Sequence, residues 1–291
     1  IYYGSWCNYP PIPIEEYDLD GIDYIYVSHI HPDHFDPATF ERLNKDIPVL
    51  IHKYHKQFLK MNITRLGFKV IELENGQPFE LGGSTKISIF AADDCDPSIC
   101  GHMFGCITSE IKGSMQLDSL CVIEDGNHVV VNTNDCPYGI AENTLKRVKS
   151  LYKNIDFALV GYTSASLYPH CMMDYDETKM MVGVKHAKKV GLTSGLNTLK
   201  VLLPNYYMPF AGTYILGGKY AYKNKNLPLP EIQDAVSYFQ DNLSDGDSVV
   251  NPILLNLGES FNLESKSASA KYIPVDREKR DRYITNVAAH F

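Results

Sequence analysis

The chain has 291 residues, of which 44% are hydrophobic, and its formal net charge is −8 at pH 7. This length and apolar content allow one large α/β domain with a substantial core. The acidic balance argues against a nucleic-acid surface, which needs clustered Lys and Arg. No apolar run approaches the roughly 18 residues that span a bilayer, and no signal-peptide pattern stands near Ile1. We therefore expect a cytoplasmic protein that acts on a small molecule, with no nucleic-acid or membrane partner.

The seven cysteines agree with a reducing compartment, because they are odd in number and a chain of this length does not need disulfides. Cys95, Cys100 and Cys106 lie in one stretch, but they form no C-x-x-C pair, so we interpret them as thiols. Cys100 and His102 give half of a Rieske-type signature whose second half does not follow. The sequence therefore predicts no iron–sulfur cluster.

Hydrophobic periodicity gives the expected elements in chain order. The predicted strands cover residues 24–28, 49–52, 68–73, 79–81, 85–90, 120–124, 129–132, 157–160 and 206–209. The predicted helices cover about residues 37–43, 53–59, 142–153, 176–189 and 196–203. Two β-rich layers covered by helices are typical of an α/β fold of the αββα sandwich type. We predict a single catalytic domain over residues 1–291, with residues 219–229 as a surface excursion.

The most informative motif follows the first predicted strand. His29, His31, Asp33 and His34 lie within six residues. Imidazoles and carboxylates are ligands of Zn, Fe and Mn. On a strand-to-helix turn, this spacing would let His29 and His31 face one metal ion, and Asp33 and His34 a second. A solvated histidine-rich loop is the other interpretation, and the density of ligands favours the metal site.

Asp135 follows a second apolar strand, residues 129–132. A binuclear site needs a bridging anion, and an acid at the tip of a strand can provide one. An Asp directly after Asn134 is also a common turn residue. The segment alone does not distinguish the bridging ligand from the turn residue.

The order of these pieces resembles the metallo-β-lactamase superfamily, in which an H-x-H-x-D-H loop after a strand is followed by an Asp after a later strand. Within it, the sequence is most similar to the CMP-N-acetylneuraminate hydroxylase family. The resemblance implies a metallo-β-lactamase-like αββα fold with one or two divalent ions, Zn, Fe or Mn, and it makes Asp135 the bridging ligand. It rests on residues 23–34, 46–49, 131–136 and 208–212, and more weakly on residues 252–263.

The chain differs from the wider superfamily or from the hydroxylase family in three features. Relatives have a His upstream of the bridging Asp, where this sequence, aligned on Asp118 and Cys121, has Ser114; the nearest imidazole, His102, is therefore a candidate ligand. Many members of the superfamily have a last His where this chain, like the hydroxylase family, has the segment 208–212. The hydroxylase family also carries an N-terminal Rieske domain, which is not found in these 291 residues.

Five further histidines divide into one candidate and four others. His170 follows the predicted strand 157–160 and is a candidate ligand that could face the cleft, although a His in such a place is more often a loop residue. We interpret the other four as structural or surface groups; they are His52, His55, His128 and His186.

Three functional hypotheses follow. A metal-activated water would hydrolyse a phosphodiester, ester or lactone, with Asp33 as the catalytic residue that orients or deprotonates the water. With iron, the same ligands can instead activate O₂, in a hydroxylase that acts on a nucleotide-sugar-like or other small molecule and needs an electron-donor protein. The third hypothesis, a ligand-binding protein with a degenerate site, is suggested by the missing last His. The hydrolase is the expectation from sequence.

Overall fold

The structure is a computed structural model, and it describes residues 6–12, 19, 21–92, 118–163, 166–210, 213–243 and 250–290. His102, Ser114 and the cysteines at 95, 100 and 106 lie outside the described residues, so the predictions made for them stay predictions. No described helix is long and apolar enough to cross a membrane.

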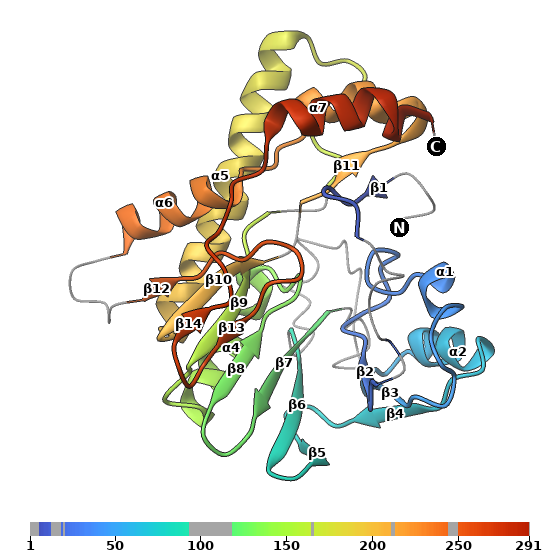
Figure 1. Ribbon diagram of the computed structural model, residues 1–291, viewed down its shortest axis with the longest axis vertical. Helices are drawn as coiled ribbons and strands as arrows, with labels where there is room; N and C mark the ends of the chain where they lie inside the picture. The colour runs from blue at the N-terminus through green and yellow to red at the C-terminus, as the bar shows by residue number, and fades with distance from the viewer. Residues whose placement is uncertain are drawn as a thin grey trace.

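Two sheets face each other at the centre of the molecule (Figure 1). The larger has seven strands in the order β12-β10-β9-β8-β7-β6-β5, and the smaller has three in the order β2-β3-β4. The strands of the larger sheet are β5 (Pro78–Gly82), β6 (Thr85–Ala91), β7 (Ser119–Glu124), β8 (Val129–Asn132), β9 (Phe157–Gly161), β10 (Tyr206–Phe210) and β12 (Asn251–Pro252). Those of the smaller sheet are β2 (Ile25–Tyr26), β3 (Val49–His52) and β4 (Val70–Leu73).

Three apolar layers result from the alternation of side chains along these strands. On β6, Ile87 and Ile89 point into the layer between the two sheets, whereas Phe90 points to the opposite layer. That opposite layer is covered by α4 (Tyr138–Leu151), α5 (Glu177–Leu202) and α6 (Ile232–Asn242). The outer face of the small sheet packs on α1 (Pro37–Phe40) and α2 (Phe58–Arg65). The order helix, sheet, sheet, helix confirms the predicted αββα sandwich.

Two helix predictions were wrong. The helix expected at residues 53–59 begins only at Phe58 and runs to Arg65. The two helices expected at residues 176–189 and 196–203 are one continuous helix, α5. Glycines lower helix propensity, but Gly191 and Gly195 let α5 pack closely against β9: an added Cβ would lie 2.7 Å from the carbonyl oxygen of Tyr162 and 2.8 Å from that of Gly161, respectively. Tertiary packing therefore outweighs the local propensity.

The strand directions bring several chain segments to one edge of the sandwich. β7 and β8 are antiparallel, with Cys121 opposite Asn132, so the beginning of β7 and the end of β8 share an edge. β2 and β3 are parallel, with Tyr26 opposite Leu50, so both run toward this edge. A side-chain contact joins the two sheets at this edge, because the Tyr26 hydroxyl lies 2.9 Å from the Ser119 hydroxyl.

Distant parts of the chain meet above this edge. β1 (Trp6–Cys7) pairs with β11 (Ile215–Leu216), and Trp6 stacks on Tyr214 with 4.0 Å between ring centroids. Leu227 and Leu229 pack on this cluster, so the segment predicted as a surface excursion is partly packed. The remaining elements of the C-terminal part of the chain are η3 (Gly218–Asn226), β13 (Phe261–Asn262), β14 (Ser267–Ala268), α7 (Arg277–Asn286) and η4 (Ala288–His290).

Candidate metal centre

Two groups of ligand atoms lie at this edge. His29, His31 and Asp118 form one, here called the Asp118 group, and His29, His34 and Asp135 form the other, the Asp135 group. Within each group the ligand atoms lie within 4.8 Å of one another. His29 belongs to both, and its Nε2 atom lies 3.4 Å from Oδ1 of Asp118 and 3.9 Å from Oδ2 of Asp135. The imidazoles come from the small-sheet side and the carboxylates from the large sheet.

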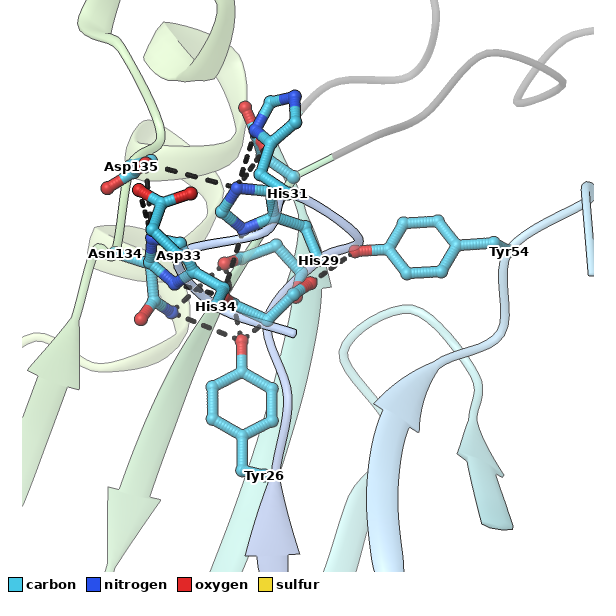
Figure 2. Close-up of polar contacts among 11 residues, drawn as sticks. Tyr26, His29, His31, Asp33, His34, Tyr54, Asn134 and Asp135 are labelled. Carbon is cyan, nitrogen blue, oxygen red and sulfur yellow. Dashed lines mark hydrogen bonds and ion pairs between the residues drawn. The ribbon is translucent and has the colours of Figure 1, made fainter. Parts of the chain in front are cut away.

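The loop after β2, which carries His29, His31, Asp33 and His34 in Figure 2, is folded back on itself by backbone hydrogen bonds. The backbone N–H groups of His34 and Phe35 both donate to the carbonyl oxygen of His31. Phe35 is buried against the small sheet, and the carboxylate of Asp36 caps α1 by accepting from the Thr39 N–H. With the loop fixed at both ends, the His31 Nδ1 atom lies 2.8 Å from the His29 Nε2 atom.

Asp135 is placed by a tight turn after β8. Asn134 has φ of 47°, a left-handed conformation that Asn tolerates better than most residues. Its backbone N–H donates to the side chain of Asn132. If the β7–β8 register is continued to this turn, Asp118 stands opposite Asp135. Like charges directly opposite each other are destabilising in a sheet, so a cation between the two carboxylates fits this arrangement.

Below the imidazoles lies a hydrogen-bond network with defined directions. The hydroxyls of Tyr54 and Ser119 both donate to the carbonyl oxygen of Ser28. Because Ser119 has thus used its only hydrogen, the Tyr26 hydroxyl is the donor toward Ser119, where both the hydroxyl and the carbonyl oxygen lie within reach. The side-chain amide of Asn134 donates in turn to the Tyr26 hydroxyl and to the Ser119 carbonyl oxygen. The network joins β2, β7, the end of β8 and the segment after β3 (Figure 2).

The imidazoles of His29 and His34 differ in their pKa shifts. Burial, together with the neighbouring His34 ring, lowers the pKa of His29 to about 3, so the ring is neutral at pH 7. Burial also acts to lower the pKa of His34, but the hydrogen bond and charge of Asp135 outweigh it and the pKa is raised. Burial acts to raise the pKa of Asp135, and the His34 contact outweighs it in the other direction. His34 Nε2 lies 3.2 Å from Asp135 Oδ2, as in an ion pair.

The structure thus brings together five of the seven predicted site residues. His29, His31, His34 and Asp135 belong to the two groups, and the carboxylate of Asp33 lies 3.8 Å from His34 Nε2. The metal and catalytic roles of these residues remain predictions.

His170 is buried in the loop before α5, and it belongs to neither group of described ligand atoms. Its predicted role is therefore without geometric support.

Sequence reasoning missed Asp118. It served only as an alignment point, although the sequence holds two signals for it: an acid borders the strand, and the turn-forming residues 124–127, Glu-Asp-Gly-Asn, stand between this strand and the next. A hairpin through that turn places the start of the first strand beside the end of the second, where Asp135 lies.

Comparison with known proteins agrees with the fold. The family described as "Beta-lactamase superfamily domain" matches residues 6–188. CmlA, a diiron β-hydroxylase from Streptomyces venezuelae, superimposes with a TM-score of 0.51 at 13% identity, over 86% of this chain and 46% of that one. An isothiocyanate hydrolase from Delia radicum gut bacteria superimposes with a TM-score of 0.52 at 15% identity, over 82% of this chain and 77% of that one. At these identities, the likeness shows the fold.

Two curated relatives are also similar in sequence. A putative Rieske 2Fe-2S iron-sulfur protein of Mycolicibacterium smegmatis is 31% identical over 178 residues, which are 60% of this chain and 30% of that protein. Cytidine monophosphate-N-acetylneuraminic acid hydroxylase of Asterias rubens is 24% identical over 221 residues, 73% of this chain and 30% of that protein. The predicted resemblance to this superfamily and to the hydroxylase is confirmed, and the match spans about a third of each relative's length.

Proposed function

The chain belongs to the beta-lactamase superfamily domain family, and from this premise we propose that it is a binuclear iron enzyme that uses O₂ to hydroxylate a small organic molecule. The donor sets carry the proposal: each group consists of two imidazoles and one carboxylate, and because the groups share His29, one ion at a time can have this full set. Two His and one carboxylate are the ligands of non-haem Fe(II) oxygenases. The similar proteins include a diiron hydroxylase and an iron–sulfur protein, and both names support an iron enzyme that uses O₂.

The residues present fit two divalent ions. One nitrogen binds one ion, so if the His29 Nε2 atom binds an ion with His31 and Asp118, the second ion is left with His34, Asp135 and the nearby Asp33. The three carboxylates offset most of the charge of two divalent ions, which lowers the cost of burying that charge. Because His29 is neutral down to about pH 3, protons do not compete for its nitrogen near neutral pH.

When bound, the ions would supply the redox chemistry with O₂. The overall reaction converts a C–H bond and O₂, with two electrons and two protons, into a C–OH group and water. In this scheme Asp118 and Asp135 hold the ions from the large sheet, while the loop after β2 holds them from the other side. Ser28, Tyr26 and their partners orient the loop. The exposed part of Asp135, 29% of its side chain, leaves the Asp135 group open to solvent and to a substrate.

The two electrons must come from another protein or domain. The reaction consumes them, and a donor of the iron–sulfur class is the one suggested by the Rieske relative, of which this chain covers only 30%. We propose such an electron-transfer partner together with a small-molecule substrate. A nucleotide sugar is the candidate substrate class suggested by the hydroxylase relative.

A hydrolase is the second candidate, and Asp33 favours it. Its carboxylate belongs to neither ligand group, yet it lies 3.8 Å from His34 Nε2. A carboxylate that binds no ion would be available to take a proton from a metal-activated water. In this alternative, Zn or Mn fills the centre and the substrate is an ester, a lactone or a phosphodiester.

One experiment separates the two candidates. The protein is purified from iron-supplemented cells without added metal, its metal content is measured, and O₂ uptake is followed after chemical reduction. We expect about two irons per chain and O₂ uptake that is lost in Asp118→Ala but kept in Asp241→Ala, a control on the exposed side of α6. A protein that retains only zinc, takes up no O₂ and hydrolyses a panel of esters, lactones or phosphodiesters would establish the hydrolase instead.

A further inference from the structure

The Ser28 side chain lies between the two histidines that face the carboxylates. Its hydroxyl oxygen is 3.0 Å from Nδ1 of His29 and 3.1 Å from Nδ1 of His34. Ser28 is 3% exposed. The other ring nitrogens, the Nε2 atoms, point the opposite way, toward Asp118 and Asp135. One buried hydroxyl therefore contacts the rear of a ring in each of the two ligand groups.

Counting hydrogens shows what this hydroxyl must do when metal binds. A neutral imidazole has one N–H, and the other nitrogen carries the free lone pair. To bind an ion through Nε2, each ring must carry its hydrogen on Nδ1. Both Nδ1–H groups then point at the Ser28 oxygen, which has two lone pairs and can accept both. If Ser28 instead donated to one ring, that ring would carry its hydrogen on Nε2 and could not bind metal there.

We propose that Ser28 is a positioning residue that accepts hydrogen bonds from His29 and His34 together, and so fixes the metal-binding tautomer of both rings. The inference rests on the metal binding in the proposed function but not on the reaction. Its consequence is specific, because one hydroxyl controls a ligand of the Asp118 group and a ligand of the Asp135 group. Deleting it leaves two imidazole N–H groups without their acceptor, and both ion positions are affected.

Ser28 is itself held in place before any ion binds. Its carbonyl oxygen accepts hydrogen bonds from Tyr54, 2.5 Å away, and from Ser119, 2.7 Å away. These hydroxyls approach from the segment after β3 and from β7, so both sheets fix the backbone that carries the Ser28 side chain. Preorganised ligands lose less freedom when the ion arrives, and partners behind metal ligands typically contribute 10- to 100-fold to metal affinity.

The test compares zinc affinity of metal-free wild type, Ser28→Ala and Ser88→Ala by competition with a chromophoric chelator. Ser88 is a matched control, since it is also a buried strand-associated serine whose hydroxyl bonds a side chain, Tyr152, away from the cluster. We expect Ser28→Ala to weaken binding of both ions by about 10- to 100-fold, and Ser88→Ala to leave it unchanged. Ser28→Ala with wild-type affinity for both ions overturns the inference and leaves the proposed function standing.

A second measurement does not depend on the variant folding. Long-range ¹H–¹⁵N spectra of the zinc-loaded wild type report which nitrogen of each ring carries hydrogen. We expect Nδ1–H in both His29 and His34. An Nε2–H in either ring overturns the inference, and a wild-type protein that binds no zinc, iron or manganese overturns the proposed function and the inference with it.

Discussion

The Asp118 group and the Asp135 group share His29, yet they differ in burial and in charge. Asp118 is 6% exposed, whereas the side chains of Asp135 and His34 are 29% and 19% exposed. His29 is neutral at pH 7 because burial lowers its pKa to about 3. His34 has a raised pKa and forms an ion pair with Asp135. The shared His29 therefore has no proton to lose when an ion binds, whereas His34 must exchange a proton for its metal.

The largest effect is expected when one carboxylate is removed at a time, which tests whether each group binds its own ion. Asp118→Ala and Asp135→Ala should each reduce the metal content from two ions per chain to one, because each ion position loses a carboxylate ligand. The loss of affinity should exceed the roughly 100-fold that is typical for partners behind the ligands. Elemental analysis after gel filtration measures it. If either variant keeps both ions, that carboxylate is not a ligand and the two-group description fails.

Acid should distinguish the two positions. A metal must displace the proton of His34, so affinity at the Asp135 group falls as pH drops through the raised pKa of His34, by up to about tenfold per pH unit. His29 of the Asp118 group has a pKa of about 3 and adds no proton competition in this range, so the Asp135 group should lose its ion first. Metal content measured after equilibration from pH 8 to pH 5 should fall from two to one. Simultaneous loss of both ions would contradict the comparison.

His52 tests whether burial alone explains a lowered imidazole pKa. It is 3% exposed, burial lowers its pKa to about 4, and among the described residues neither ring nitrogen has a hydrogen-bond partner. Its unfolded pKa is higher, so the unfolded state binds the proton more readily and stability falls as pH drops from about 6.5 to 4, by on the order of 2–3 kcal/mol. In the metal-free protein, His52→Leu should make the free energy of unfolding, measured with denaturant, less sensitive to acid. Added metal should not reduce this acid sensitivity.

The smallest effect is expected at Asn134, which lies in the hydrogen-bond network below the imidazoles. Its amide donates to Tyr26 and to the carbonyl oxygen of Ser119, and its φ is 47°. Asn134→Ala should destabilise the protein by about 2–3 kcal/mol, from the lost hydrogen bonds and the left-handed backbone. Asn134→Gly loses the hydrogen bonds but relieves the backbone, and should cost about 1 kcal/mol less. If thermal unfolding shows the same loss of stability in Asn134→Ala and Asn134→Gly, only the hydrogen bonds contribute and the backbone conformation does not.

The local half of the site was predictable, because its residues are neighbours in sequence. His29, His31, Asp33 and His34 lie in one loop whose short hydrogen bonds fix their relative positions. Asp135 was predictable through its place after an apolar strand and the family resemblance. The prediction of two helices in place of the single helix α5 was wrong, because Gly191 and Gly195 weaken a helix locally but permit its contact with β9.

The sequence by itself determined the αββα class and the array of imidazoles in the loop after β2, because periodicity and short spacing are encoded locally. Only the tertiary structure revealed Asp118 as the second carboxylate and placed the Ser28 hydroxyl behind two rings. Asp118 reaches His29 across 89 residues through the pairing of strands and the packing of two sheets. Such contacts depend on register and layer order, which no short stretch of the chain specifies.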